Sequence, residues 1–453
     1  MSSCKFVILI PDGCADWAIG RFGNRTPLQV AAMPNVAALA RRGIVGRSSN
    51  VPAGLSPGSD VATLGLLGYD PNIYYTGRAP LEAAAQNIEL GKNDWAIRCN
   101  LVTVAPHDDT GNDTDNNTDN NTEEGTDNDT EIMQSFTAGH ISSPEAAEMI
   151  ETLNGQLNGQ LDKSGFGLPE CSLPECRLPE CPLPECRLHF VAGVSYRNLA
   201  ILRDAPAGIF DRQTKTFPPH DYTGKPVSGA LPSGTGSGLL RRITDASKSL
   251  LKNHPVNQKR LAAGKLPVTQ IWLWGLGQKP ELPLFNAGSG AMITAVDLLR
   301  GIAGNIGWEV ISVPGITGYT DTDYAAKGRY AAEALKTHDI VCVHIEATDE
   351  AGHEGNAEKK IKALEDIDAK TLPPIMEALH RYEHWKVFIS PDHPTPCALK
   401  THTGDYVPWL YAASGFDTHS HQTYDEETAR HSRCRVDDGY KLMPQLLDGS
   451  IGK

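Results

Sequence analysis

The stretch DIVCVHIEATDEAGH, residues 339–353, decides the fold of this chain. Its first half is a short run rich in Val and Ile, which is typical of a strand buried in a parallel sheet. Its second half changes to acidic and imidazole side chains, including Asp349 and His353. Ligands of open α/β sheets bind beyond the carboxyl ends of the strands, so this change predicts a functional site at that edge.

The same pattern occurs at two other places. KFVILIPD (5–12) ends in Asp12, and KVFISPDH (386–393) ends in Asp392 and His393. A further imidazole, His402, follows in the loop KTHTGD. An Asp after one strand often only starts a turn, but three strand ends that each deliver an Asp indicate a shared site. Carboxylate and imidazole together suit Mn²⁺ or Zn²⁺, and six such residues are enough for two ions.

Strand-like and helix-like stretches alternate along most of the chain. TQIWLWGLG (269–277) and WEVISVPG (308–315) add further apolar runs, and helical patterns such as TDYAAKGRYAAEALKTH (322–338) lie between them. This alternation predicts an α/β fold with a mainly parallel sheet. We expect residues 1–90 and 266–453 to form one metal-binding core, interrupted by a smaller inserted α/β domain at 91–265.

Two segments interrupt the globular pattern. Residues 108–131, DDTGNDTDNNTDNNTEEGTDNDTE, hold ten acidic and no basic side chains, and therefore account for most of the net charge of −14. They are almost free of apolar residues, which predicts disorder. Residues 168–187, LPECSLPECRLPECPLPECR, repeat a five-residue unit four times. This repeat favours an expanded surface loop, and a soft-metal site built from its cysteines is the alternative.

The composition also argues against several classes of protein. No apolar run approaches the ~18 residues of a membrane span, and the N-terminal run leads into Pro-Asp-Gly rather than a small-residue cleavage site. The chain has no basic tract typical of nucleic-acid binding. We therefore expect a cytoplasmic protein that acts on a small molecule, with neither nucleic acid nor a membrane as its partner.

A serine stands at an unusual place in GLSPGSDVATLGLLGYDP (54–71). Ser59 follows a Pro-Gly turn and precedes an apolar, helix-like run. The simplest interpretation is a helix N-cap. The alternative is a nucleophile at the positive end of a helix, where a phosphoryl group is also stabilised. A bound metal ion would lower the pKa of the hydroxyl, so the predicted metal site favours the nucleophile.

Several stretches carry a family resemblance, and they span nearly the whole chain apart from the two low-complexity segments. They are PDGCAD, PGSDVATLGLLGYDP, YYTGRAPLEAA, RCNLV, AGHIS, GVSYRNL, DEAGHEG and PDHPTP with the later THT. In these stretches the chain resembles the cofactor-independent phosphoglycerate mutases of the archaeal type, within the alkaline phosphatase superfamily. The resemblance implies an alkaline-phosphatase-like core with a smaller domain that closes over substrate. It also implies interconversion of 3-phosphoglycerate and 2-phosphoglycerate without 2,3-bisphosphoglycerate.

The resemblance also implies roles for individual residues. By motif match, Ser59 accepts the phosphoryl group and forms a phosphoserine intermediate. Two divalent ions are implied, with Mn²⁺ preferred to Zn²⁺ or Mg²⁺. One would be held by Asp12, Ser59, Asp392 and His393, and the other by Asp349, His353 and His402. The candidate clamps for the substrate's phosphate or carboxylate are Arg197 and Lys327, followed by Arg78 and His140, each with a solvated surface charge as the alternative.

A departure from the mutase pattern leaves a second function open. TQIWLWGLGQKPELPLF, HPVNQKR and HDYTGKP resemble a bacterial subset of the family for which a homoserine kinase role has been proposed. A kinase requires ATP, but both reactions transfer a phosphoryl group at the same kind of metal site. The predicted ligands therefore do not separate the two activities.

Overall fold

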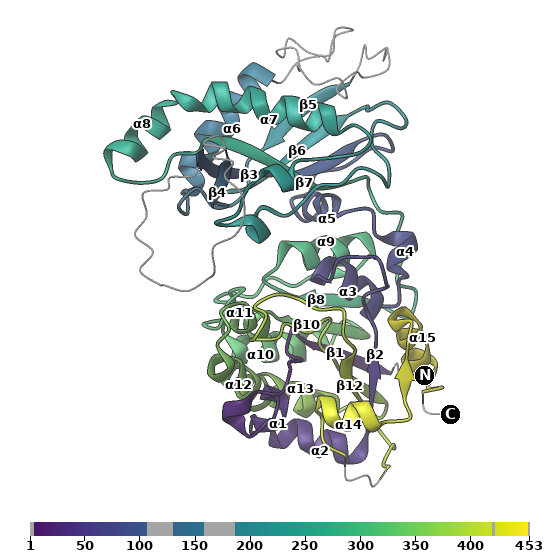
Figure 1. The fold of residues 1–453 in the computed structure, drawn as a ribbon. Coiled ribbons are helices and arrows are strands. Elements are labelled where there is room, and N and C mark those ends of the chain that lie inside the picture. Colours follow the sequence, from purple (N-terminus) through teal and green to yellow (C-terminus); the bar gives the residue numbers. More distant parts are fainter. Residues whose placement is uncertain (1–3, 107–129, 158–185, 419–421, 452–453) are drawn as a thin grey trace. The chain divides into compact units, whose positions relative to one another are not determined.

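The computed structural model describes residues 4–106, 130–157, 186–418 and 422–451. The chain divides into two compact units (Figure 1). The first unit comprises Met1–Tyr75, Ala84–Ile88 and Pro280–Lys453, and the second comprises Thr76–Ala83 and Glu89–Lys279. The two low-complexity segments predicted at 108–131 and 168–187 lie outside the described residues, apart from two residues at the end of each.

An eight-stranded sheet forms the centre of the first unit. Its pairs are parallel except for the two made by β12, so the predicted α/β fold with a mainly parallel sheet is confirmed. In spatial order the strands are β13 (Arg435–Val436), β2 (Ile44–Ser48), β12 (Val407–Ala413), β11 (Trp385–Ile389), β1 (Lys5–Pro11), β10 (Ile340–Ile345), β8 (Gly290–Ile293) and β9 (Glu309–Val310).

The three central strands end at the same level of this sheet. Strand β1 is parallel to both neighbours, with Pro11 opposite Ile345 of β10 and Leu9 opposite Ile389 of β11. Each strand is fully buried or nearly so, as expected for β-branched runs covered on both faces. The loops that follow these strands therefore leave the sheet at one edge, although β1 lies more than 300 positions before β10 and β11 in the sequence.

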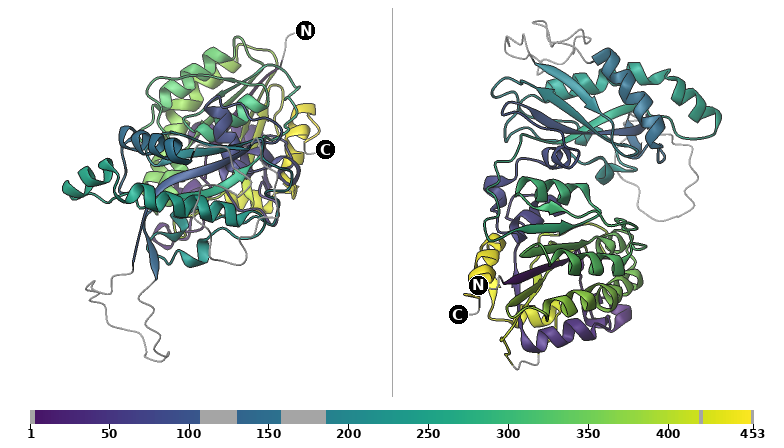
Figure 2. Two further views of the ribbon diagram at one scale, coloured as in Figure 1. Left: turned by 90° about the horizontal axis from the view of Figure 1, so that it is seen from above. Right: turned by 180° about the vertical axis from the view of Figure 1, so that it is seen from behind.

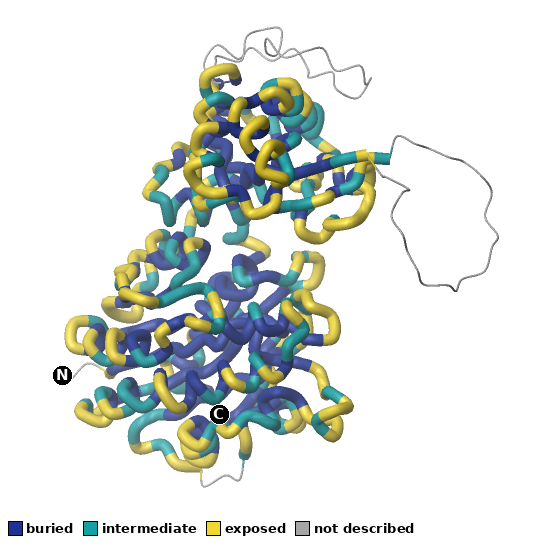
Figure 3. Tube along the Cα trace, turned by 90° about the vertical axis from the view of Figure 1, so that its left-hand side faces the viewer, coloured by how far each residue is buried: buried dark blue, intermediate teal, exposed yellow. Residues whose placement is uncertain are grey.

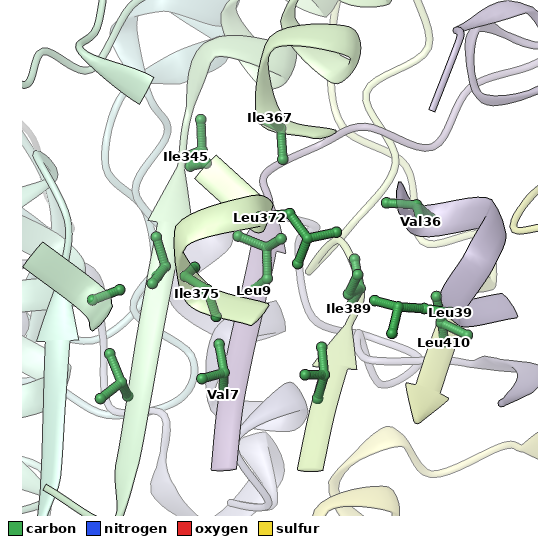
Figure 4. Packing of buried hydrophobic residues seen from close by; sticks show 14 of the residues in the cluster. Val7, Leu9, Val36, Leu39, Ile345, Ile367, Leu372, Ile375, Ile389 and Leu410 are labelled. Carbon is green, nitrogen blue, oxygen red and sulfur yellow. The ribbon is translucent and has the colours of Figure 1, made fainter. Parts of the chain in front are cut away.

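Alternate side chains of the sheet pack against a layer of helices. Val7 and Leu9 of β1 share a core with Ile389 of β11 and Leu410 of β12 (Figure 4). Burying each of these side chains stabilises the fold by about 1.5–3 kcal/mol. Among the helices that contribute side chains to this core are α2 (Pro34–Arg42), α10 (Tyr324–Ala334), α12 (Ala357–Asp366), α13 (Leu372–Leu379) and α14 (Glu426–His431), with the π-helical turn η5 (Ile367–Thr371).

The first unit contains further helices and turns. They are α1 (Pro27–Val30), α3 (Ser59–Leu66), α4 (Pro71–Tyr74), α9 (Asp297–Asn305), α11 (Ala347–His353) and α15 (Leu442–Asp448), together with the 3₁₀ turns η1 (Gly20–Phe22) and η6 (Gly439–Lys441). Two of them, α3 and α11, begin at the edge of the sheet where the candidate site lies.

The second unit contains an antiparallel sheet covered by helices on one face. Its strands are β4 (Glu131–Ser135), β3 (Trp95–Pro106), β6 (Arg197–Arg203), β5 (Arg187–Val191) and β7 (Gln270–Gly277). Its helices are α5 (Arg78–Ala85), α6 (Ser143–Leu157), α7 (Ser237–Lys252) and α8 (Pro255–Ala262), with turns η3 (Pro219–Tyr222) and η4 (Ser228–Ala230) (Figure 2).

Strand β7 shows where the sequence interpretation was wrong. We expected the apolar run at 269–277 in the metal-binding core, whereas β7 pairs with β3 in the second unit and the unit boundary follows Lys279. The run at 308–315 also contributes only the two-residue edge strand β9, which is exposed. Strands of both sheets are largely buried, and Figure 3 shows buried stretches inside both units, so burial alone does not tell the two sheets apart.

Of the helices in the described segments, none has the length and apolar character needed to cross a membrane.

Candidate metal centre

The loops after β1, β10 and β11 bring the predicted ligands together. Asp12 directly follows β1, and Asp392 and His393 follow β11 after two residues. Helix α11 begins two residues after β10, and because Asp349 and His353 are four residues apart on it, they lie on the same face. His402 lies in the segment between β11 and β12, and all these residues belong to the first unit.

Two groups of ligand atoms are compact enough to hold ions. Asp12, Asp392 and His393 form one group and Asp349, His393 and His402 form the other, with the ligand atoms of each group within 4.8 Å of one another. His353 adjoins the second group, since its Nε2 lies 3.2 Å from Asp349 Oδ2 and 2.9 Å from His402 Nε2. The implied ligands therefore all lie together, although His393 belongs to both groups rather than to one.

Two buried carboxylates in this cluster are only partly compensated. One oxygen of each is hydrogen-bonded, whereas the other lies near His393 Nε2, at 3.5 Å for Asp12 and 3.4 Å for Asp392. Asp12 Oδ1 and Asp392 Oδ2 are buried and accept no hydrogen bond from any described residue. Burying a carboxylate without a hydrogen bond or opposite charge is costly, because the protein interior solvates ions poorly. Divalent cations would supply the missing charge, and the oxygen and imidazole atoms present are the ligands that Mn²⁺ and Zn²⁺ accept. The residues present thus fit a pair of metal ions.

The electrostatics divide the cluster into two parts. Burial, reinforced by the nearby carboxylate of Asp392, raises the pKa of Asp12 well above its usual range. Burial also acts to raise the pKa of Asp349, but the hydrogen bonds from His353 and His402 outweigh it and hold that pKa well below normal. Burial acts to lower the pKa of His353, yet its hydrogen bond with Asp349 raises it to about 9.

Ser59 lies beside this cluster, but it is not the helix cap. Helix α3 begins at Ser59 itself, and the N-cap position is Gly58, which has no side-chain hydrogen bond. The hydroxyl Oγ of Ser59 instead lies 3.1 Å from Nε2 of His393. The N-cap interpretation of Ser59 is therefore wrong by one residue, and the hydroxyl is available to the cluster.

A glycine allows the ligand loops to approach one another. Gly13, directly after Asp12, has a φ of 58°, in the left-handed region that glycine adopts without strain. A Cβ atom at this position would overlap Asp349 Oδ1 and Thr395 Oγ1. The Asp-Gly pair therefore permits the turn after β1 to pass against the first turn of α11.

Several residues that support the ligands are missing from the sequence interpretation. His344, within β10, lies with Nε2 2.9 Å from Asp12 Oδ2, and its other ring nitrogen is 3.2 Å from Thr294 Oγ1. The hydroxyl of Thr395 donates to Asp349 and lies 3.3 Å from His393 Nδ1. The sequence offered a signal for His344, because it is a histidine inside an otherwise apolar strand. Thr395 stands in no distinguishing sequence pattern.

The four candidate substrate clamps lie in different surroundings. Lys327 is fully buried in the first unit, and its ammonium donates to the His344 carbonyl at 2.9 Å. Burial lowers its pKa to about 8, against the opposing effect of Glu346 and Asp12. It therefore contributes positive charge behind Asp12, and it is not the solvated surface charge that was the alternative to a substrate clamp.

The other three clamps belong to the second unit. Glu82 Oε1 accepts from Arg78 at 3.0 Å, and its other oxygen pairs with the buried Arg98 at 2.9 Å. Burial acts to raise the pKa of Glu82, but Arg98, Arg78 and the exposed Arg197 lower it, so Arg197 lies close enough to interact. His140 lies on an exposed turn after β4, and its backbone amide donates to Thr137.

Comparison with known proteins identifies the family. The sequence matches the metalloenzyme superfamily over residues 4–434. A protein of Geobacter sulfurreducens, named a probable 2,3-bisphosphoglycerate-independent phosphoglycerate mutase, is 40% identical over 98% of this chain and 100% of its own length. A protein of Methanothrix thermoacetophila, named as such a mutase, is 41% identical over the same shares of both chains. The chain belongs to the 2,3-bisphosphoglycerate-independent phosphoglycerate mutase family.

Solved structures agree with this phosphoglycerate mutase fold. The PH0037 protein from Pyrococcus horikoshii is 24% identical with a TM-score of 0.71, and the match covers 99% of this chain and 97% of that one. The cofactor-independent phosphoglycerate mutase from Thermoplasma acidophilum is 23% identical with a TM-score of 0.58, over 99% and 100% of the two chains. The α/β fold of this chain is therefore shared with both of these solved proteins.

Proposed function

We propose that this protein interconverts 3-phosphoglycerate and 2-phosphoglycerate without 2,3-bisphosphoglycerate, in the cytoplasm, through a phosphoserine at Ser59. The observation that carries the proposal is the position of the Ser59 hydroxyl, 3.1 Å from His393 within the cluster of candidate metal ligands. The names of the relatives at about 40% identity support the mutase over the homoserine kinase alternative.

The first half-reaction transfers the phosphoryl group to the protein. The Ser59 oxygen attacks phosphorus, a Ser–O–P bond forms, and the bond between phosphorus and the glycerate oxygen breaks. The Ser59 hydroxyl loses its proton in this step, and the glycerate oxygen takes up one proton and becomes an alcohol, so the protons balance. Helix α3 begins at Ser59, so its positive N-terminus stabilises the negative charge on the phosphoserine. The second half-reaction reverses these steps with the other hydroxyl of glycerate.

The candidate ligands would hold two divalent ions. Asp12, Asp392 and His393, with Ser59, would bind one ion, and Asp349, His353 and His402 would bind the other. When bound, such ions stabilise charge on the transferring phosphoryl group and lower the pKa of the attacking hydroxyl. Mn²⁺ is our preferred ion, with Zn²⁺ or Mg²⁺ as alternatives, because the ligand set mixes carboxylate and imidazole.

Cationic side chains would bind the anionic groups of the substrate. Arg197 is exposed and Arg78 is held by Glu82, and a guanidinium binds carboxylate or phosphate through two parallel hydrogen bonds. His140 is a further candidate because it is exposed. Lys327 would add positive charge behind Asp12.

The decisive experiment uses purified protein with Mn²⁺ and no 2,3-bisphosphoglycerate. We expect 3-phosphoglycerate to convert to 2-phosphoglycerate without ATP. The conversion is monitored by a coupled enolase assay or by ³¹P NMR. A protein that leaves 3-phosphoglycerate unchanged but phosphorylates homoserine with ATP would contradict the proposal and restore the kinase alternative.

A further inference from the structure

A buried lysine next to the candidate metal centre has no role in the proposed reaction. Lys360 lies on α12, and its side chain is fully buried. Its ammonium donates to the Asp16 carboxylate at 2.9 Å, to the Thr395 carbonyl at 2.8 Å and to the Ala15 carbonyl at 3.3 Å. An ammonium has three hydrogens, so these acceptors use its full capacity.

The acceptors of Lys360 belong to the two loops that carry metal ligands. Ala15 and Asp16 lie in the loop after β1, three and four residues beyond Asp12, and Thr395 lies two residues beyond His393. The single ammonium of Lys360 thus bonds backbone carbonyls of both loops. Lys360 therefore ties together segments that are about 380 residues apart in the sequence.

Asp16 completes this junction from the other side. Its carboxylate accepts the backbone amide of Cys397 at 3.1 and 3.2 Å and that of Trp17 at 2.8 Å, in addition to the Lys360 ammonium. The amide of Thr395 also donates to the Ala15 carbonyl at 3.2 Å. The two loops are thus joined by direct hydrogen bonds, with the buried Lys360–Asp16 ion pair at their centre.

Thr395 connects this junction to the ligands. Its carbonyl accepts from Lys360, while its hydroxyl donates to Asp349 and lies 3.3 Å from His393 Nδ1. A shift of this backbone would therefore move the side chains that orient a carboxylate and an imidazole in the cluster. Groups that orient metal ligands in this way typically change metal affinity by 10–100-fold when they are removed.

We propose that Lys360 and Asp16 are positioning residues that hold the two ligand loops at the separation required for metal binding. This inference rests on the proposed metal centre. It assigns no contact with substrate to either residue, and it predicts that the pair acts on metal affinity through the position of Thr395 rather than through general stability.

The test compares Lys360→Met with a matched variant in the second unit, Arg260→Met. Arg260 is also buried, pairs with Glu145 at 2.9 Å and donates to the Leu266 carbonyl at 2.9 Å, but the second unit contains none of the candidate ligands. Mn²⁺ affinity is measured by calorimetry on metal-free protein, and melting temperature is recorded for each variant. We expect Lys360→Met to lose 10–100-fold in Mn²⁺ affinity and Arg260→Met to keep wild-type affinity, although both melt at lower temperature.

A second pair of variants separates positioning from stability. Asp16→Asn with Lys360→Met removes both charges, so it should regain melting temperature relative to Lys360→Met alone, because no unpaired charge stays buried. The inference is wrong if the Mn²⁺ affinity of the double variant recovers together with its melting temperature. It is also wrong if Lys360→Met binds Mn²⁺ as tightly as the wild type does. If Lys360→Met does not fold, Asp16→Asn alone carries the same test. Wild-type protein that binds no Mn²⁺ would instead contradict the proposed metal centre.

Discussion

The hydroxyl of Ser59 lies 3.1 Å from the Nε2 atom of His393, a residue 334 positions later in the chain. Ser59 begins helix α3, and His393 follows the central strand β11, so the contact joins two separate supports of the candidate site. It places a potential nucleophile at the only imidazole that, among the described residues, belongs to both candidate ligand groups.

This contact predicts the outcome of Ser59→Ala. Because Ser59 is not the capping residue, we expect the melting temperature to change little, while mutase activity falls roughly 10³-fold or more. Wild-type protein quenched in acid after exposure to 3-phosphoglycerate should carry phosphate on the peptide containing Ser59, as detected by mass spectrometry. Ser56→Ala, which alters an exposed serine before the Pro-Gly turn, is the control and should keep full activity.

The buried carboxylates predict opposite effects of Asp12→Asn on stability and activity. The substitution removes a buried charge that is close to Asp392, so the free energy of unfolding of metal-free protein should rise by about 1–3 kcal/mol. Mn²⁺ should raise the melting temperature of the wild type but not that of the variant, and activity should be lost. If metal-free Asp12→Asn is less stable than the metal-free wild type, the charge of the buried Asp12 carboxylate is already balanced by its neighbours.

Asp349→Ala tests the second group of ligands, and a chelator tests both. Each treatment should abolish turnover, and added Mn²⁺ should restore the chelated wild type but not the variant, because the carboxylate both binds and neutralises the ion. Turnover and divalent-metal content are measured on the same sample, before and after chelation, so that the two can be compared. Full turnover in protein free of divalent metal would contradict the two-ion centre.

The pKa of His353 predicts how metal binding depends on pH. Without metal, the hydrogen bond to Asp349 raises this pKa to about 9, so the ring is protonated at neutral pH. A protonated imidazole cannot bind a metal ion, and binding must displace the proton. The Mn²⁺ affinity should therefore increase by up to about tenfold per pH unit from pH 7 and level off above pH 9. Calorimetry in buffers of different ionisation enthalpy measures the released proton, and His353→Gln should lose this contribution.

Glu82 offers a test of the arginine group in the second unit. Glu82→Gln weakens the hold on Arg78 and Arg98, so we expect KM for 3-phosphoglycerate to rise about tenfold with little change in kcat. Asp94→Asn is the matched control, since Asp94 pairs with Arg203 in the same unit but has no proposed contact with substrate. Equal kinetic effects of both substitutions would reduce Glu82 to a structural role.

The low-complexity segments predict tolerance to deletion. Pro106 and Glu131 face each other across the β3–β4 pair, so an Asn-Gly turn can replace residues 107–130. We expect this deletion, and separately that of residues 168–185, to leave kcat/KM within a few-fold, because every candidate ligand lies in the first unit. Zinc analysis of the second deletion and its parent tests the alternative metal site of the Cys repeats.

The sequence predicted the central strands and the ligands at their ends because both depend on local patterns. An apolar run that stops at Asp12 or Asp392 is visible in a few residues. It did not predict the place of β7, since the same apolar pattern suits a strand of either sheet and only pairing with β3 decides between them. His344 and Thr395 were missed for a related reason, because their role comes from neighbours distant in the sequence.

The separation between β1 and its partners has a consequence for synthesis of the protein on the ribosome. Strand β1 emerges first, but β10 and β11, which flank it, begin only at Ile340 and Trp385. The second unit, in contrast, is nearly one continuous segment that ends at Lys279. Domains fold as units while the chain is made. The second unit has therefore been fully synthesised, and can fold, before the strands that pair with β1 exist. During that interval the apolar strand β1 is exposed without its partners, which makes the partly synthesised chain prone to aggregation.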